Sequence, residues 1–164
     1  MHASSYQLMG QFLQTIGQDD KVLDVGSYAV QGSYRDLVRP GNYTGLDIAE
    51  GPNVDVVVKD PYNWLEVPIW SYDVIISGQA LEHIEFPWLT VQEMNRSLRP
   101  GGRVCIIVPS AGKEHRYPLD CYRYYPDGLA ALAKWVGWEV EEVRRYPELN
   151  KQWQDCVLIA RKPK

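Results

Sequence analysis

The sequence has few cysteines, no excess of positive charge and no long apolar run. Cys105, Cys121 and Cys156 are an odd number of thiols without metal-type spacing, so free thiols in a reducing cytoplasm are expected. The net charge of -4 argues against nucleic acid as a partner, because a phosphate backbone favours a basic face. No segment approaches membrane-spanning length, and no leader indicates secretion. These absences predict a cytoplasmic protein that does not insert into a membrane.

The chain is long enough for one domain with a sizeable core, and we expect a single domain over residues 1–164. Its composition, 45% apolar and 23% charged, is typical of a globular protein. The aromatic residues are unevenly placed. Four of the eleven tyrosines lie between residues 117 and 125, in a polar stretch that we expect to be a loop.

Apolar runs of strand length alternate with helical patterns, which is typical of an α/β fold. Strands are expected at residues 21–25, 42–48, 54–58, 72–77, 103–108, 138–145 and 156–160. Helices are expected at residues 4–16, 87–98 and 126–136, with a short one at 33–38. The last two strands should form an antiparallel hairpin, because residues 146–154 lack helical periodicity.

Two details of this pattern are specific predictions. Ser4 and Gln7 have the spacing of a capping box for the first helix, and Gly17 is placed to end it. Only residues 49–53 separate the second and third strands, whereas a crossover helix needs about a dozen residues. We therefore expect a reduced, non-helical connection there.

The first expected strand ends with an acid, Asp24, and Val25. A glycine, Gly26, and a small polar residue, Ser27, follow it. In open α/β sheets, ligands bind at the carboxyl ends of strands, near the point where the strand order reverses. Glycine at this turn lets the backbone approach a ligand closely. The sequence therefore predicts a binding site after this strand.

Four motifs together resemble the class I S-adenosylmethionine-dependent methyltransferases, in particular the small-molecule branch called type 11. They read Val-Leu-Asp-Val-Gly-Ser, Tyr-Thr-Gly-Leu-Asp, Tyr-Asp-Val-Ile-Ile-Ser-Gly-Gln-Ala-Leu-Glu-His and Leu-Arg-Pro-Gly-Gly-Arg. The resemblance implies a Rossmann-like seven-stranded sheet, mostly parallel, with a C-terminal antiparallel hairpin strand. Two stretches, Gly-Ser-Tyr-Ala-Val-Gln-Gly-Ser and His-Arg-Tyr-Pro-Leu-Asp-Cys-Tyr-Arg-Tyr-Tyr-Pro, resemble a bacterial subgroup whose genes lie near those of surface-glycan biosynthesis. The first loop departs from the family, with Tyr28 and Val30 where small residues are usual.

The resemblance implies S-adenosyl-L-methionine as the cofactor. Asp47 offers two acceptor oxygens that suit the ribose hydroxyls. Asp60 could accept from the adenine amino group, although Pro61 has no N–H for the ring. The expected cofactor-binding residues are Asp24, Gly26, Ser27, Tyr28, Asp47, Ile48, Asp60, Pro61, Ser77, Gly78 and Gln79.

The loop at residues 113–125 is the expected acceptor pocket, because aromatic faces suit sugar rings and cations. Its expected substrate-binding residues are Tyr117, Tyr122, Arg123 and Tyr124. A hydroxyl acceptor would benefit from a general base, for which the candidates are His115, then His83 and Asp120. His83 could equally be a packed residue at a helix start.

No metal is expected. Some quinone O-methyltransferases that this stretch resembles hold a divalent metal with a Glu-His pair and an acid three residues before it. Here the pair is Glu82 and His83, and the earlier position is Gln79, a poor replacement for a carboxylate.

The sequence thus predicts methyl transfer to a small-molecule or glycan-type acceptor, favouring O-methylation. The alternative is a non-catalytic methyltransferase-like interaction module. A nicotinamide-dependent oxidoreductase is disfavoured, because Tyr28 and Gln31 stand where a Gly-x-Gly-x-x-Gly loop needs glycines. A homodimer is compatible with the sequence.

Overall fold

The computed structural model describes residues 3–164 and has seven strands in one sheet. The strands are β1 (Val22–Val25), β2 (Tyr43–Asp47), β3 (Val56–Val57), β4 (Tyr72–Gly78), β5 (Leu98–Val108), β6 (Glu139–Arg145) and β7 (Cys156–Arg161). Their order is β3-β2-β1-β4-β5-β7-β6. The first five are parallel, and β7 pairs antiparallel with both β5 and β6. The predicted sheet and its C-terminal hairpin are confirmed.

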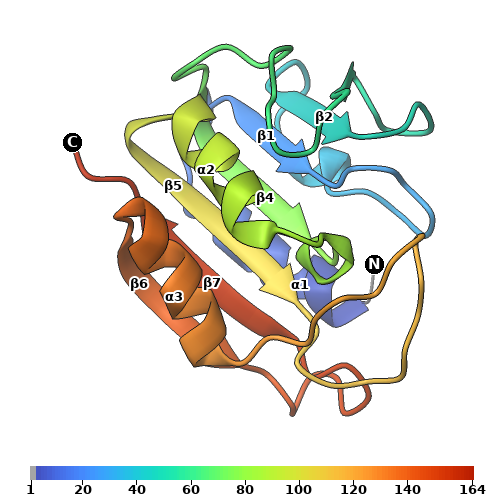
Figure 1. Cartoon of the computed structure of the whole chain (residues 1–164). Coiled ribbons are helices and arrows are strands. Elements are labelled where there is room, and N and C mark those ends of the chain that lie inside the picture. The colour runs from blue at the N-terminus through green and yellow to red at the C-terminus, as the bar shows by residue number, and fades with distance from the viewer. Residues whose placement is uncertain (1–2) are drawn as a thin grey trace.

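Three α-helices cover the two faces of the sheet. They are α1 (Ala3–Leu13), α2 (Pro87–Ser97) and α3 (Pro126–Val136), and Figure 1 shows α2 and α3 on one face with α1 behind. Leu129, Leu132 and Ala133 of α3 are buried, as their helical spacing predicts. Gly137, with φ 77°, adopts the left-handed conformation that ends this helix.

The crossovers in the first half of the chain are almost without helix. A single 3-10 turn, η1 (Arg35–Leu37), lies between β1 and β2, and residues 48–55 run from β2 to β3 without a helix, as predicted. Residues 58–71 also contain no helix, in keeping with the expected helices, none of which lies there. Trp64 anchors this segment to the core, because its side chain is fully buried. Its indole N–H donates to the Pro61 carbonyl at 3.0 Å.

Some predicted boundaries were wrong. The first helix ends at Leu13 rather than just before Gly17. The Thr15 hydroxyl donates a hydrogen bond to the Phe12 carbonyl at 2.7 Å, where the helix would otherwise continue. The Ser4 hydroxyl donates to the Asp155 carboxylate at 2.5 Å, which replaces the predicted capping box. The fifth strand begins at Leu98, five residues before its predicted start, because Tyr72 pairs with Leu98 ahead of a register shift. β3 is reduced to two residues.

The strand order reverses between β1 and β4, which are neighbours although β2 and β3 lie between them in the sequence. The segments that follow β1, β2, β3, β4 and β5 therefore emerge at one edge of the sheet, with the switch point between the first and fourth strands. In Figure 1 the long loop after β5, drawn in orange, passes the ends of β4 and β5. Within the described residues, no helix has the length and apolar character needed to cross a membrane.

Candidate functional site at the carboxyl edge of the sheet

The turn after β1 is built around a glycine that contacts the turn after β4. Gly26 has φ 82°, a conformation that L side chains rarely adopt. A Cβ added there would lie 2.3 Å from the Cβ of Ala80. This glycine therefore joins the two turns on either side of the switch point.

Behind this turn, a buried acid belongs to a polar network. The Asp24 carboxylate accepts a hydrogen bond from the Tyr43 hydroxyl, which in turn accepts from the Asn53 side-chain amide at 2.8 Å. The same amide donates to the Ser27 carbonyl at 2.9 Å. Burial raises the pKa of Asp24 to about 7. Asp24 is 3% exposed and Ser27 is 5% exposed, so both shape the turn from within.

Asp47, at the end of β2, has its carboxylate fixed by backbone groups. One oxygen accepts from the Tyr28 N–H at 3.0 Å and the other from the Ile48 N–H at 2.8 Å. The Tyr28 ring packs on the connection after β2, where a Cβ at Gly51 would lie 2.1 Å from it. Each carboxylate oxygen has a further lone pair, so Asp47 keeps acceptor capacity for two more donors.

After β3, Asp60 accepts from the Tyr62 N–H at 2.8 Å. The Pro61 carbonyl accepts from the Trp64 indole and, at 3.3 Å, from the Thr90 hydroxyl. Pro61 is therefore tied to the protein on its carbonyl side and has no N–H to offer a ligand.

The turn after β4 contains the third set of predicted residues. The Ser77 hydroxyl is buried and donates to the Val25 carbonyl at 2.8 Å, which bridges the switch-point strands. Gly78 is covered by the Tyr34 ring, whose hydroxyl would lie 2.0 Å from an added Cβ. Gln79 has φ 59°, and its side-chain amide donates to Asp155 at 2.9 Å. Its Oε1 atom is buried and has no hydrogen-bond partner among the described residues.

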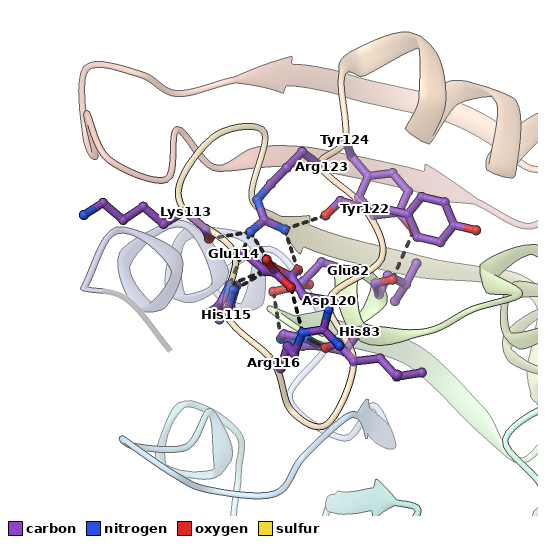
Figure 2. Close-up of polar contacts among 12 residues, drawn as sticks. Glu82, His83, Lys113, Glu114, His115, Arg116, Asp120, Tyr122, Arg123 and Tyr124 are labelled. Carbon is purple, nitrogen blue, oxygen red and sulfur yellow. Dashed lines mark hydrogen bonds and ion pairs between the residues drawn. The ribbon is translucent and has the colours of Figure 1, made fainter.

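An ion pair between Arg123 and Asp120 fixes the loop after β5. Arg123 donates to both carboxylate oxygens of Asp120, at 2.6 and 2.8 Å, and to the carbonyls of Lys113 and Tyr122. These hydrogen bonds hold the pKa of Asp120 well below its ordinary value. Asp120 also accepts from the backbone N–H of His115 at 2.7 Å. Figure 2 shows this pair beside His115, Glu82 and His83.

Two histidines from different elements meet at this loop. His83, at the end of the short turn η2 (Leu81–His83), and His115 have ring centroids 4.8 Å apart. The Nδ1 atom of His83 lies 2.6 Å from the Leu119 carbonyl, an acceptor, so Nδ1 carries a proton, and in the neutral ring Nε2 then has the lone pair. Burial, followed by the nearby His83, lowers the pKa of His115, which favours a neutral imidazole at pH 7.

The tyrosines of the loop have different roles. Tyr117 is 62% exposed, and its ring centroid lies 5.8 Å from that of His83 and 6.1 Å from that of His115. Tyr124 is buried, and its hydroxyl donates to the Leu81 carbonyl at 3.1 Å. The Tyr122 hydroxyl donates to the Glu85 carbonyl at 2.7 Å. Of the predicted tyrosines, Tyr117 presents the most open face beside the histidines.

Sequence reasoning missed three residues that shape this edge. Asn53 links Ser27 to Tyr43, Tyr34 covers Gly78, and the Trp153 ring lies 4.7 Å from that of His115. No spacing pattern identifies them, because each acts through a contact distant in the sequence. Glu82 was noted only as half of a pair, although it is fully buried.

A family model and several solved structures connect this chain with known methyltransferases. The family model described as "Methyltransferase domain" matches residues 23–106, just over half of the chain. No curated protein matches the sequence.

Solved structures share the fold at low sequence identity. The 1,6-didemethyltoxoflavin-N1-methyltransferase of Burkholderia thailandensis, with bound 1,6-didemethyltoxoflavin and S-adenosylhomocysteine, has a TM-score of 0.75 and 20% identity over 98% of this chain and 79% of that one. An S-adenosylmethionine-dependent methyltransferase of Mesorhizobium loti has a TM-score of 0.71 and 15% identity over 98% of both chains.

A third structure is a complex from Haloferax volcanii between the Trm112 methyltransferase activator and a methyltransferase. It has a TM-score of 0.71 and 18% identity over 98% of this chain and 89% of that one. The family match, together with the sheet order and the acidic strand ends at one edge, makes this chain a member of the class I S-adenosylmethionine-dependent methyltransferases.

Proposed function

We propose that the protein methylates a hydroxyl group of a small-molecule or glycan-type acceptor, which is held beside His83, His115 and Tyr117. One observation carries the proposal. The loop after β5 brings an exposed aromatic ring and two imidazoles together beside the turn after β4. An aromatic face suits a sugar ring or another flat acceptor, and a neutral imidazole can accept a proton.

The cofactor is S-adenosylmethionine, and the residues at the switch point fit it. When bound, it supplies a methyl group on a cationic sulfur, so the protein mainly has to align the two reactants. We assign Asp47 to the ribose hydroxyls, because its carboxylate is held by two backbone N–H groups and keeps free lone pairs. The unpartnered Oε1 of Gln79 is an acceptor for the ammonium end of the cofactor.

The other residues predicted to bind the cofactor fall into two groups, those that form the turns and those that border the cofactor. Gly26, Gly78 and Ser77 set the backbone of the turns, and Asp24 and Ser27 support them from within. Tyr28 and Ile48 present their N–H groups to Asp47. Asp60 and Pro61 border the expected adenine position after β3, where Asp60 keeps acceptor capacity.

The residues predicted to bind the acceptor are also divided by their contacts. Tyr122, Arg123 and Tyr124 donate to the protein itself, so we assign them to shaping the loop. Asp120 is committed to Arg123, and its low pKa makes it a poor base. His115 is the proposed base, because its lowered pKa keeps the imidazole neutral at pH 7.

The test is transfer of a labelled methyl group from S-adenosylmethionine to a panel of sugars, phenols, catechols and amines. We expect hydroxyl acceptors to be methylated, with at least a tenfold lower rate for His115→Ala. The rate should fall with pH below the ordinary histidine pKa, as the imidazole becomes protonated. Methylation of amines alone would overturn the O-methylation assignment. Cofactor binding without any acceptor would instead favour a non-catalytic module.

A further inference from the structure

Glu82 is a buried carboxylate with no hydrogen-bond partner among residues 3–164. Its side chain is fully buried, and among the described residues neither carboxylate oxygen has a hydrogen-bond partner. A buried acid normally has hydrogen bonds or a counter-charge, because burial without them costs several kcal/mol. The group that this site lacks is a positive charge or a set of donors next to Glu82.

The surroundings of Glu82 supply ligands rather than charge. Its Oε1 atom lies 3.6 Å from the Nε2 atom of His83, the nitrogen whose lone pair is free. One ligand atom from each of Glu82, His83 and His115 can be chosen so that all three lie within 4.8 Å of one another. Arg123, whose charge acts on Glu82, already donates to both carboxylate oxygens of Asp120.

We propose that Glu82, His83 and His115 form a binding site for a first-row divalent metal ion of the Zn²⁺ type. One carboxylate and two imidazoles are the donor set of known catalytic zinc sites. Around a tetrahedral ion, two ligands about 2.1 Å from the metal lie about 3.4 Å apart. Binding therefore needs ligand atoms that are now up to 4.8 Å apart to close by as much as about 1.4 Å. Mixed nitrogen and oxygen donors disfavour Mg²⁺ and Ca²⁺, which prefer oxygen alone.

Neighbouring groups orient both imidazoles, as is usual around protein metal sites. The Leu119 carbonyl holds the Nδ1 proton of His83 at 2.6 Å. Nδ1 of His115 accepts from Arg123 at 3.3 Å, so Nε2 carries the proton of the neutral ring. Binding of the ion through Nε2 would therefore move this proton to Nδ1, which lies 3.6 Å from the Asp120 carboxylate. The ion would compensate the buried charge of Glu82.

The site departs from the arrangement considered from the sequence alone. Within the same segment the sequence offers only Gln79 as a third ligand, and its amide is a poor replacement for a carboxylate. The fold instead supplies His115 from the loop after β5. Three protein ligands leave at least one coordination position open, next to the exposed ring of Tyr117. A hydroxyl acceptor bound there would lose its proton more easily. In the metal-loaded protein His115 would be a ligand, so its role as the base belongs to the metal-free site alone.

The experiment measures metal binding directly, without an acceptor. The full-length protein is stripped with chelator, loaded with Zn²⁺ or Co²⁺, desalted and analysed for metal by mass spectrometry, and the Co²⁺ form is examined by visible absorption. The variants are Glu82→Gln and His115→Ala. The matched control is Glu114→Gln, which removes an exposed acid one residue from His115 and paired with Arg116.

We expect one metal ion per chain in the wild type and in Glu114→Gln, with the absorption of a four- or five-coordinate Co²⁺ ion. Binding should weaken at least tenfold in each ligand variant. Equal binding by wild type and both ligand variants, or no binding by the wild type, would overturn the proposal. If Glu82→Gln fails to fold, His115→Ala decides. Titration of each variant with S-adenosylhomocysteine separates this result from the proposed function, because cofactor binding does not use these ligands.

Discussion

Replacing Glu82 with glutamine should make the metal-free protein more stable at high pH and leave it nearly unchanged at low pH. The pKa of Glu82 is about 8 in the folded protein and 4.5 in the unfolded chain. Below pH 4.5 both states are protonated, so the group has no effect. Between pH 4.5 and 8 the folded state keeps a proton that the unfolded state has released, so the stability of the wild type falls as the pH rises.

The size of this effect follows from the pKa difference. One pKa unit corresponds to about 1.4 kcal/mol, so ionisation of Glu82 lowers the free energy of unfolding by up to about 5 kcal/mol between pH 4.5 and 8. Glu82→Gln removes this term and keeps the shape of the side chain. At pH 8.5 the variant should therefore be several kcal/mol more stable than the wild type, whereas at pH 5 the two should be similar.

Urea denaturation followed by circular dichroism, in chelator at pH 5 to 8.5, measures this difference. Titrating groups distant from Glu82 are common to both proteins and cancel, whereas His83, whose Nε2 lies 3.6 Å from Glu82, is coupled to it. Glu114→Gln is the control, because Glu114 is 62% exposed and should show no pH-dependent difference. A difference between wild type and Glu82→Gln that stays constant over this pH range would refute the reasoning. Saturating Zn²⁺ should also stabilise the wild type and not the variant.

Two further predictions concern glycines near the site. Gly26→Ala should lower the free energy of unfolding by about 3 kcal/mol, because Gly26 has a positive φ and an added Cβ would clash with Ala80. Gly41→Ala is the control and should lower it by about 1 kcal/mol, because Gly41 has a positive φ but open space around it. Equal losses in urea titrations would contradict the packing argument. Gly51→Ala should displace the Tyr28 ring and cost about 1–2 kcal/mol, much of which should be absent in a Tyr28→Ala background. Additive costs in that double-mutant cycle would show that the two residues do not interact.

The order of elements could be predicted because it depends on local patterns. Apolar runs ending in Asp24 or Asp47 mark buried parallel strands, and Pro87 and Pro126 mark helix starts. The short stretch before β3 excludes a crossover helix by length alone. These signals operate over a few residues, and the sequence contains them.

Features that depend on distant partners could not be predicted. Ser4 satisfies the local rule for a helix cap, but its hydroxyl bonds to Asp155 from the other end of the chain. Arg123 suits a phosphate or a sugar, but it is committed to Asp120 within its own loop. The convergence of Glu82 and His115 requires knowledge of how the loop after β5 folds back.

The central claim is that the carboxyl edge of the sheet binds S-adenosylmethionine through Asp47. Calorimetric titration of wild type and Asp47→Ala with S-adenosylmethionine and S-adenosylhomocysteine tests it most directly, with Asp36→Ala on η1 as a control acid. The account predicts one site per chain in the wild type and the control, and at least tenfold weaker binding in Asp47→Ala. No binding by the wild type, or equal binding by Asp47→Ala, would contradict it.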